Sequence, residues 1–374
     1  MSRRRSLRVR TLFGALVLLG LGWVAASRRE STARAKPHRH DTREPAPRPR
    51  APRRPLAPDS PWASREACER ALGAGRAPRP AGVARIGAWN LHWFPDGRPG
   101  EAHADGGADL AWLACGIAWL GVDVLAVEEI KRPPRGDEGL AELTRRLDAL
   151  TGGTWQSLLD ECPHASSQHV GFLFDAKRVK LRSHAVVGAL NPLGEPCKNE
   201  LRPGLAGYFG FPGGLDLSIV VAHLKSGVGE RDITDRALSF AAFGAAAAAE
   251  HRRTGDGDVL FLGDMNTMGC EDCDPQVSPG AELTRIDALF APPHAALARL
   301  EAEPACSHHY AGRSVLLDWA AKSDLAELPG GRHVNVSGPC AELGCDALGD
   351  RLAAQRLLSD HCPIWVDLDD VDRD

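Results

Sequence analysis

The chain has 374 residues, which is long for one compact domain, and its 43% hydrophobic and 25% charged residues exclude a fibrous, collagen-like or fully disordered protein. Residues 1–61 contain 15 Lys and Arg against 4 Asp and Glu, whereas residues 62–374 contain 30 against 45. The acidic body argues against a protein that coats nucleic acid by neutralising many phosphates, but it suits an enzyme whose carboxylates bind metal ions.

Residues 1–26 have the pattern of an export signal. Five arginines between residues 3 and 10 precede an apolar stretch at residues 12–26, which ends in the small residues Val24, Ala25 and Ala26. The stretch is shorter than the roughly 20 residues of a membrane-spanning helix. We expect a signal peptide and a periplasmic or secreted protein, the alternative being an uncleaved N-terminal anchor. The run at residues 2–8 resembles a twin-arginine signal, which leaves the export route open.

Residues 27–61 alternate Arg, Pro and Ala and offer almost nothing to bury. Such a segment cannot offset its ordering entropy, so we interpret it as a disordered, solvated linker. The alternative is a basic strip that contacts anionic surfaces or a polyanionic substrate. The catalytic domain is then residues 62–374.

Ten cysteines follow the export signal, and an even number in an oxidising compartment predicts disulfides. Their spacing alone does not determine the pairing. Cys270 and Cys273 could also form half a zinc site or a redox pair. No second closely spaced pair and no nearby His-x₃-His accompanies them, so we favour structural disulfides.

The body alternates short apolar runs with helical patterns, which predicts a layered α/β domain. The predicted strands are residues 84–90, 122–127, 170–174, 215–223, 259–262, 315–320 and 363–368. The predicted helices are residues 110–120, 139–150 and 236–253.

Polar side chains follow five of the apolar runs. They are Asn90, the pair Glu128 and Glu129, His223, Asp264 with Asn266, and Asp360 with His361. A polar residue directly after a buried strand lies at the rim of the sheet with its backbone fixed. Carboxylate, carboxamide and imidazole groups gathered there suit a divalent-metal site for phosphoryl transfer or hydrolysis.

The order of these motifs resembles the endonuclease/exonuclease/phosphatase superfamily. The motifs are Trp89-Asn90, residues 123–129, His223, residues 263–266, residues 317–319 and residues 359–364. The resemblance covers about residues 83–369 and implies the superfamily's fold, an α/β (α+β) four-layer, two-sheet β-sandwich flanked by helices.

Three features resemble the secreted, deoxyribonuclease-like branch of that superfamily. They are Arg202, His223 at the end of its run, and Cys270 or Cys273 with Cys306, at the positions where the deoxyribonuclease has a disulfide.

The resemblance also implies site residues. Glu129 and Asp360 would bind Mg²⁺ or Mn²⁺, and Asn90 would orient the Glu129 carboxylate and the phosphate. Asp264 and Asn266 would position or deprotonate the attacking water and stabilise the developing charge.

The remaining implied roles surround the scissile phosphate. His361 would act there, held in its tautomer by Asp318, a carboxylate that interrupts an apolar run and so requires a partner. His223 would face His361 across the phosphate, and Arg202 would bind a phosphate oxygen bidentately. The resemblance puts a glutamate beside His223, and the nearest match is the neutral Gln168, which favours a hydrogen-bonding His223 over one that transfers protons.

Two more positions depart from the superfamily. Glu128 stands where relatives often have Gln, and it would point to the face opposite Glu129. His92 stands where abasic-site enzymes often have an acid. We interpret His92, His308 and His309 as loop residues rather than ligands.

The sequence therefore predicts an exported, divalent-metal-dependent phosphodiester hydrolase with nucleic acid as its first-choice substrate. It predicts a monomer without a stable protein partner. The alternatives are a sphingomyelinase-type lipid phosphodiesterase or a phosphomonoesterase, and a non-catalytic binding protein. The lipid alternative requires exposed apolar loops, for which residues 208–211 and 289–293 are the candidates.

Overall fold

The computed structural model describes residues 55–98, 107–131, 133–161, 168–193, 201–310, 313–323, 325–328, 333–345 and 352–373. The predicted export signal and most of the predicted linker lie outside these ranges, as do Cys162 and Cys197. Within the ranges, none of the helices has the length and apolar character needed to cross a membrane.

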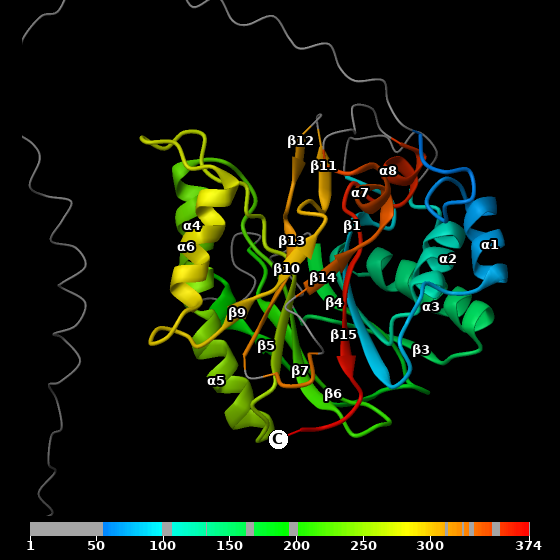
Figure 1. The fold of residues 1–374 in the computed structure, drawn as a ribbon, viewed down its shortest axis with the longest axis horizontal. Helices are drawn as coiled ribbons and strands as arrows, with labels where there is room; N and C mark the ends of the chain where they lie inside the picture. Colours follow the sequence, from blue (N-terminus) through cyan, green and yellow to red (C-terminus); the bar gives the residue numbers. More distant parts are fainter. Residues whose placement is uncertain are drawn as a thin grey trace, which may run out of the picture. The chain divides into compact units, whose positions relative to one another are not determined.

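Two large β-sheets form the centre of residues 55–373 (Figure 1). The first sheet, in spatial order, comprises β10 (Glu301–Glu303), β14 (His333–Val336), β15 (Ile364–Asp369), β1 (Val83–Phe94), β2 (Val124–Lys131), β4 (Gln168–Asp175) and β3 (Trp155–Leu159). The second comprises β5 (Lys180–Val187), β6 (Gly204–Gly210), β7 (Asp216–His223), β8 (Val259–Asp264), β13 (Asp318–Lys322) and β9 (Ala298–Arg299). A separate hairpin pairs β11 (His308–Tyr310) with β12 (Arg313–Val315).

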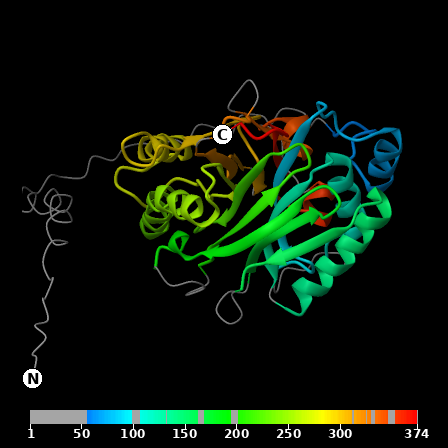
Figure 2. The same cartoon turned by 90° about the horizontal axis from the view of Figure 1, so that it is seen from below.

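Helices cover the outer faces of both sheets (Figures 1 and 2). The helices on the first sheet's side are α1 (Arg65–Ala74), α2 (Leu110–Leu120) and α3 (Arg135–Thr151). Those on the second sheet's side are α4 (Glu230–Ala241), α5 (Phe243–Thr254) and α6 (Pro279–Phe290). The short helices α7 (Gly338–Leu343) and α8 (Ala353–Leu357) lie near the C-terminal end of the chain, and η1 (Gly188–Leu190) follows β5.

Alternation of side chains along the strands builds three hydrophobic cores. In β1, Ile86 points into the core between the two sheets, and Trp89 points into the core under α1–α3. In β8, Leu262 points into the inter-sheet core, and Phe261 points into the core under α4–α6. Because successive strand residues face opposite sides, each central strand serves two cores. The four-layer, two-sheet sandwich flanked by helices is therefore confirmed.

Six of the seven predicted strands are present as β1, β2, β4, β7, β8 and β15. The predicted strand at residues 315–320 is wrong in its extent, because β12 ends at Val315 and β13 begins at Asp318. The predicted helix at residues 236–253 is two helices, α4 and α5, that meet at Ala242. The break lets Phe240 and Phe243, one from each helix, pack in the same core.

The eight described cysteines all form disulfides, as predicted. The pairs are Cys68–Cys115, Cys270–Cys273, Cys306–Cys345 and Cys340–Cys362. The implied pairing of Cys306 with Cys270 or Cys273 is wrong. Cys273 lies three residues after Cys270 and closes a local loop, so Cys306 pairs with Cys345, just beyond α7, instead.

Candidate active site

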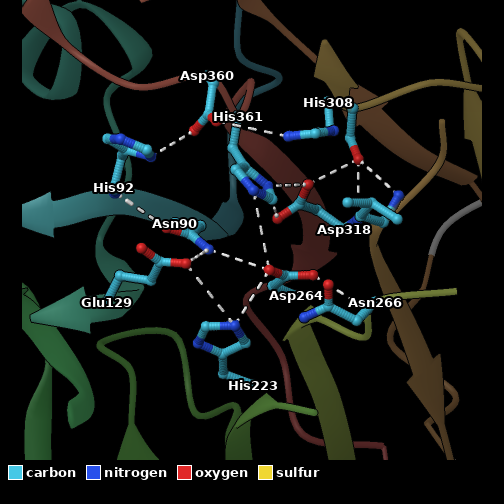
Figure 3. Close-up of polar contacts among 12 residues, drawn as sticks. Asn90, His92, Glu129, His223, Asp264, Asn266, His308, Asp318, Asp360 and His361 are labelled. Carbon is cyan, nitrogen blue, oxygen red and sulfur yellow. Dashed lines mark hydrogen bonds and ion pairs between the residues drawn. The ribbon is translucent and has the colours of Figure 1, made fainter. Parts of the chain in front are cut away.

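Strand direction gathers the predicted site residues at one edge of the two sheets. β1 runs parallel to β2, which pairs Asn90 with Glu128, and β7 runs parallel to β8, which pairs His223 with Asp264. β13 runs antiparallel to β8, so Asp318 at its start lies opposite Asp264 at the end of β8. Residues from strand ends far apart in the sequence therefore meet at one place (Figure 3).

Asn90 connects the two sheets at this edge. Its side-chain amide donates to Asp264 Oδ2 at 3.0 Å and to Glu129 Oε1 at 3.2 Å. Its side-chain oxygen accepts from the backbone N–H of His92 at 2.9 Å. The predicted orienting contact between Asn90 and Glu129 is thus present.

Irregular backbone turns the side chains of this edge toward the site. The registers of β1 with β2 and of β2 with β4 shift beyond Asn90 and beyond Val127. Glu129 adopts φ 59° and Asn266 adopts φ 51°, a region that non-glycine residues rarely occupy. A bulge re-aims a side chain at the cost of local strain, and such strain concentrates at functional sites.

Glu128 and Glu129 point in different directions, as predicted. Glu129 is partly exposed, and its second oxygen accepts from the backbone N–H of Trp93 at 3.1 Å. Glu128 is 0% exposed, and neither of its carboxyl oxygens has a hydrogen-bond partner among the described residues. Burial and the neighbouring carboxylates of Asp318 and Asp264 raise the pKa of Glu128 well above its ordinary value. Glu129 is therefore the metal-binding candidate of the pair.

The predicted pairing of His361 with Asp318 is present. His361 Nδ1 lies 2.9 Å from Asp318 Oδ2 and 3.1 Å from Oδ1. Burial alone would lower the pKa of His361, but the carboxylates of Asp318 and Asp264 together raise it well above the ordinary value. His361 is thus held as an imidazolium whose Nε2 faces Asp264 Oδ2 at 3.8 Å.

Two serines position this pair; Ser359 belongs to the motif at residues 359–364, whereas no sequence pattern singled out Ser307. Ser307 donates from Oγ to Asp318 Oδ2 at 2.7 Å and accepts from the backbone N–H groups of Leu317 and Asp318. Ser359 donates to the carbonyl of Asn90 at 2.6 Å and accepts from the N–H of His361 at 3.0 Å. They fix the carboxylate and the imidazole relative to β1 and β13.

Asp264 lies at the centre of the cluster, in contact with groups from both sheets (Figure 3). His223 Nε2 is 3.3 Å from Asp264 Oδ2. Burial raises the pKa of Asp264 to about 7, with the Asp318 and Glu129 carboxylates adding to the rise and His361 opposing it. Asn266 donates its backbone N–H to Asp264 Oδ1 at 3.0 Å and its side-chain amide to the carbonyl of Leu224. Asp264 is therefore poised to exchange a proton near neutral pH.

His223 is held neutral. Burial lowers its pKa well below the ordinary value, and Arg202 and His361 lower it further. Its Nε2 faces Asp264, and its Nδ1 has no hydrogen-bond partner among the described residues. The predicted partnership with Gln168 is therefore wrong, because Gln168 Oε1 accepts from Arg202 Nη1 at 3.0 Å instead.

Arg202 is anchored to the protein through all three guanidinium nitrogens. Besides Gln168, it donates from Nε to the carbonyl of His223 and from Nη2 to the carbonyl of Leu224, both at 3.3 Å. These contacts hold the end of β7, where His223 lies. The bidentate phosphate contact of Arg202 stays a prediction.

Asp360 lies between the imidazoles of His92 and His308. The interpretation of His92, His308 and His309 as loop residues is wrong, because His92 belongs to β1 and the other two belong to β11. Asp360 Oδ1 is 2.9 Å from His92 Nδ1, and its Oδ2 is 3.5 Å from His308 Nε2 (Figure 3). Hydrogen bonds from His308 and His92 outweigh burial and hold the pKa of Asp360 well below its ordinary value. The unusual residue two positions after Asn90 was the only sequence signal for His92, and nothing in the sequence singled out His308.

The arrangement includes groups that could bind a divalent metal. Three sets offer mutually close ligand atoms: Glu129, His223 and Asp264; Asp264, Asp318 and His361; and His308, Asp360 and His361. Glu129 and Asp264 each offer a carboxylate oxygen to the first set, beside a nitrogen of His223, and carboxylate oxygen is the donor that Mg²⁺ and Mn²⁺ prefer. The residues around Glu129 therefore fit the implied metal.

The sequence matches no protein-family profile and no curated protein. Solved structures similar to this chain include TDP2 of D. rerio in complex with a single-strand DNA product, at 16% identity, 76% coverage of this chain, 98% coverage of that chain and a TM-score of 0.48. They also include the human Nocturnin catalytic domain with bound sulfate, at 15% identity, coverages of 76% and 93% and a TM-score of 0.47. An endonuclease/exonuclease/phosphatase family protein from Bacteroides thetaiotaomicron matches at 13% identity, coverages of 76% and 94% and a TM-score of 0.48.

Proposed function

We propose that this protein is an exported, divalent-metal-dependent phosphodiester hydrolase of the endonuclease/exonuclease/phosphatase superfamily, with nucleic acid as its substrate. The observation that carries the proposal is the position of Asp264. Its carboxylate contacts Asn90 and the imidazole of His223, and it faces the imidazolium of His361, which Asp318 holds. Titratable groups whose surroundings push their pKa values apart are the pattern of an acid–base site.

Glu129 would hold Mg²⁺ or Mn²⁺, with the Asp264 carboxylate close to it and the Asn90 amide donating to both carboxylates. When bound, the metal would neutralise charge on the phosphate and on the oxygens around it. Asp360, the second implied ligand, contacts His92 and His308, so its part in this metal site stays a prediction.

The proton transfers follow from the protonation states of Asp264 and His361. The Asp264 carboxylate accepts a proton from water while the water oxygen forms a bond to phosphorus. As the bond from phosphorus to the leaving oxygen breaks, the His361 imidazolium donates its Nε2 proton to that oxygen. Asp318 keeps Nδ1 of His361 protonated throughout and stabilises the imidazolium.

Neutral hydrogen-bonding groups complete the site. His223 donates from Nε2 toward Asp264 and so orients the base, consistent with the prediction that it does not transfer protons. Asn266 fixes Asp264 through its backbone N–H and stays a candidate to stabilise developing charge on the phosphate.

The two segments that the sequence offered as membrane-inserting loops for a lipid substrate have buried phenylalanines in the structure. Phe209 and Phe211, from the first candidate apolar segment, are buried in the core between the sheets. Phe290, from the second segment, is buried in the core under α4–α6. The phenylalanines of both segments are therefore unavailable for insertion into a membrane, and the partly exposed Tyr208 lies against the Arg182 guanidinium. This favours a nucleic-acid phosphodiester over a lipid.

The test is hydrolysis by the full chain with Mg²⁺, Mn²⁺ or EDTA, against plasmid DNA, RNA, sphingomyelin and p-nitrophenyl phosphate in parallel. We expect metal-dependent cleavage of nucleic acid that His361→Ala abolishes and that His294→Ala, which removes an exposed imidazole, leaves intact. Cleavage of sphingomyelin or of the monoester alone would show that the proposed substrate class is wrong, while the assignment of the site residues would stand. Equal rates of hydrolysis for the His361→Ala variant and the parent would show that the assignment of the active site is wrong.

A further inference from the structure

A cluster of imidazole and carboxylate groups adjoins the proposed phosphate site on the side away from Glu129. His308, Asp360 and His361 each offer one ligand atom, and these atoms lie within 4.8 Å of one another. His308 Nε2 is 3.5 Å from Asp360 Oδ2, and the rings of His308 and His361 lie 4.4 Å apart, centroid to centroid. In a tetrahedral site, ligand atoms about 2.1 Å from the metal lie about 3.4 Å from one another. The spacing therefore suits a single bound cation.

The backbone holds the three residues in place. His308 and His361 form an antiparallel bridge, and the N–H of Cys362 donates to the carbonyl of Ser307 at 2.7 Å. Disulfides fix both segments, because Cys306 is bonded to Cys345 and Cys362 to Cys340. A rigid frame of this kind preorganises ligands.

Two of the three ligands also have an outer partner. Asp318 Oδ2 lies 2.9 Å from Nδ1 of His361 and so orients the ring. His92 contacts the other oxygen of Asp360 at 2.9 Å. A carboxylate behind a ligating imidazole is the usual device that sets ring orientation and tautomer at metal sites. The cluster thus has an inner set of ligands and an outer set that orients them.

We propose that His308, Asp360 and His361 form a binding site for a divalent transition metal of the Zn²⁺ class, separate from the oxygen-donor site at Glu129. Two imidazoles and one carboxylate suit borderline cations, whereas Mg²⁺ prefers oxygen donors alone. The side chains of His308 and Asp360 are 12% and 17% exposed, so a cation can reach them from solvent.

A regulatory consequence follows, and it rests on the proposed function. A cation bound to His361 displaces the imidazolium proton to solvent, so the ring has no proton to donate to the leaving oxygen in the proposed reaction. Zn²⁺ therefore inhibits hydrolysis even when Mg²⁺ saturates the site at Glu129. The two classes of cation act on the enzyme in opposite directions.

The binding test uses the full chain in a His38→Ala/His40→Ala background, which removes two imidazoles of the predicted linker. Zn²⁺ is titrated in competition with a chromophoric chelator, with excess Mg²⁺ present, and Co²⁺ serves as a probe of visible absorption. We expect one Zn²⁺ per chain. His308→Ala should weaken binding by about 100-fold or more, beyond the effect typical of an outer partner. His294→Ala should change nothing.

A second variant and a fold measurement keep this test decisive. His308→Gln preserves size and polarity, and a thermal melt of each variant shows that it is folded. If folded His308→Gln and His308→Ala bind Zn²⁺ as the parent does, the proposed site is wrong. If Glu129→Gln loses Zn²⁺ binding instead, the ion binds at the site around Glu129, and the proposed site at His308 is equally wrong.

The activity measurement separates this inference from the proposed function. With saturating Mg²⁺, Zn²⁺ should inhibit the parent, and His308→Gln should need at least tenfold more Zn²⁺ for the same fractional inhibition of its own rate. Zn²⁺ binding that depends on His308 in a protein that hydrolyses no phosphodiester would keep the site and refute the function. Metal-dependent hydrolysis by a protein that does not bind Zn²⁺ would support the proposed function and refute the Zn²⁺ site.

Discussion

Two buried charged clusters of this protein differ in how completely their polar groups are paired. At the first, Arg236 is 0% exposed and all five of its N–H donors are used. It donates twice to Glu282, and once each to the carbonyls of Lys225, Gly227 and Gly269. This cluster joins α4, α6 and the loop after β8.

At the second cluster, the candidate active site, pairing is incomplete. Both oxygens of Glu128 and Nδ1 of His223 are buried without a hydrogen-bond partner among the described residues. Four of the five described non-glycine residues with positive φ are also here: His92, Trp93, Glu129 and Asn266.

Complete pairing distinguishes a buried polar cluster that serves the fold from one that serves a reaction. A fully paired cluster leaves no buried polar group unsatisfied, and no group in it is available to a substrate. Unpaired buried groups and strained backbone cost stability, so a protein keeps them where they serve another purpose. Mutations at the two clusters should therefore act on different properties.

The largest effect is expected at the active site. Asp264→Ala should lower turnover by about 10²–10⁴-fold, because it removes the proposed general base. The melting temperature should hold or rise, since the change relieves repulsion from the Asp318 and Glu129 carboxylates. Initial rates and thermal denaturation measure the two properties. A folded Asp264→Ala variant with the parent's rate would show that the incompletely paired cluster is not the active site.

Arg236→Met should have the opposite profile. It leaves the Glu282 carboxylate buried without its ion-pair partner, which should lower the free energy of unfolding by about 3–5 kcal/mol. The rate per folded molecule should stay within about twofold of the parent. Denaturant unfolding checks the first expectation, with Arg285→Met as the exposed control on α6. Equal unfolding free energies for the two variants would contradict the account.

Ser307→Ala tests positioning within the active site. It removes the hydroxyl that binds the Asp318 carboxylate and two backbone N–H groups, a loss of about 1–3 kcal/mol for buried groups left unpaired. We expect turnover to fall about tenfold with little change in KM. Ser314→Ala, which affects His309 instead, is the matched control. Identical rates in both variants would show that Ser307 does not position the pair.

The smallest effect is expected from Glu128→Gln. The Glu128 carboxyl group is already held neutral by its surroundings, so an amide of the same shape should change turnover near neutral pH by less than about threefold. Initial rates for the two proteins check this. A large loss would mean that the ionised form of Glu128 takes part in the reaction.

Short-range patterns explain which parts the sequence could predict. Strand periodicity located β1, β2, β7 and β8, and polar residues at the ends of the apolar runs indicated Asn90, Glu129, His223 and Asp264. The apolar run that Asp318 interrupts predicted a partner for this carboxylate, and the resemblance to the superfamily implied that the partner is His361. These inferences needed only the neighbours of each residue along the chain, together with the order of the motifs.

Long-range placement explains what the sequence could not predict. His308 enters the site because its strand β11 bridges to the segment at His361, and no local pattern encodes that pairing. Gln168 turns to Arg202 rather than His223 because of where the guanidinium is anchored. The pairing of Cys306 with Cys345 likewise depends on a fold that brings together residues 39 positions apart.

The most direct test of the central claim is the rate of phosphodiester cleavage, with Mg²⁺, by the parent, His361→Ala and Arg236→Met at a temperature where all three are folded. We expect His361→Ala to lose activity by orders of magnitude and Arg236→Met to keep the parent's rate. Loss of activity in Arg236→Met with activity retained in His361→Ala would contradict the central claim.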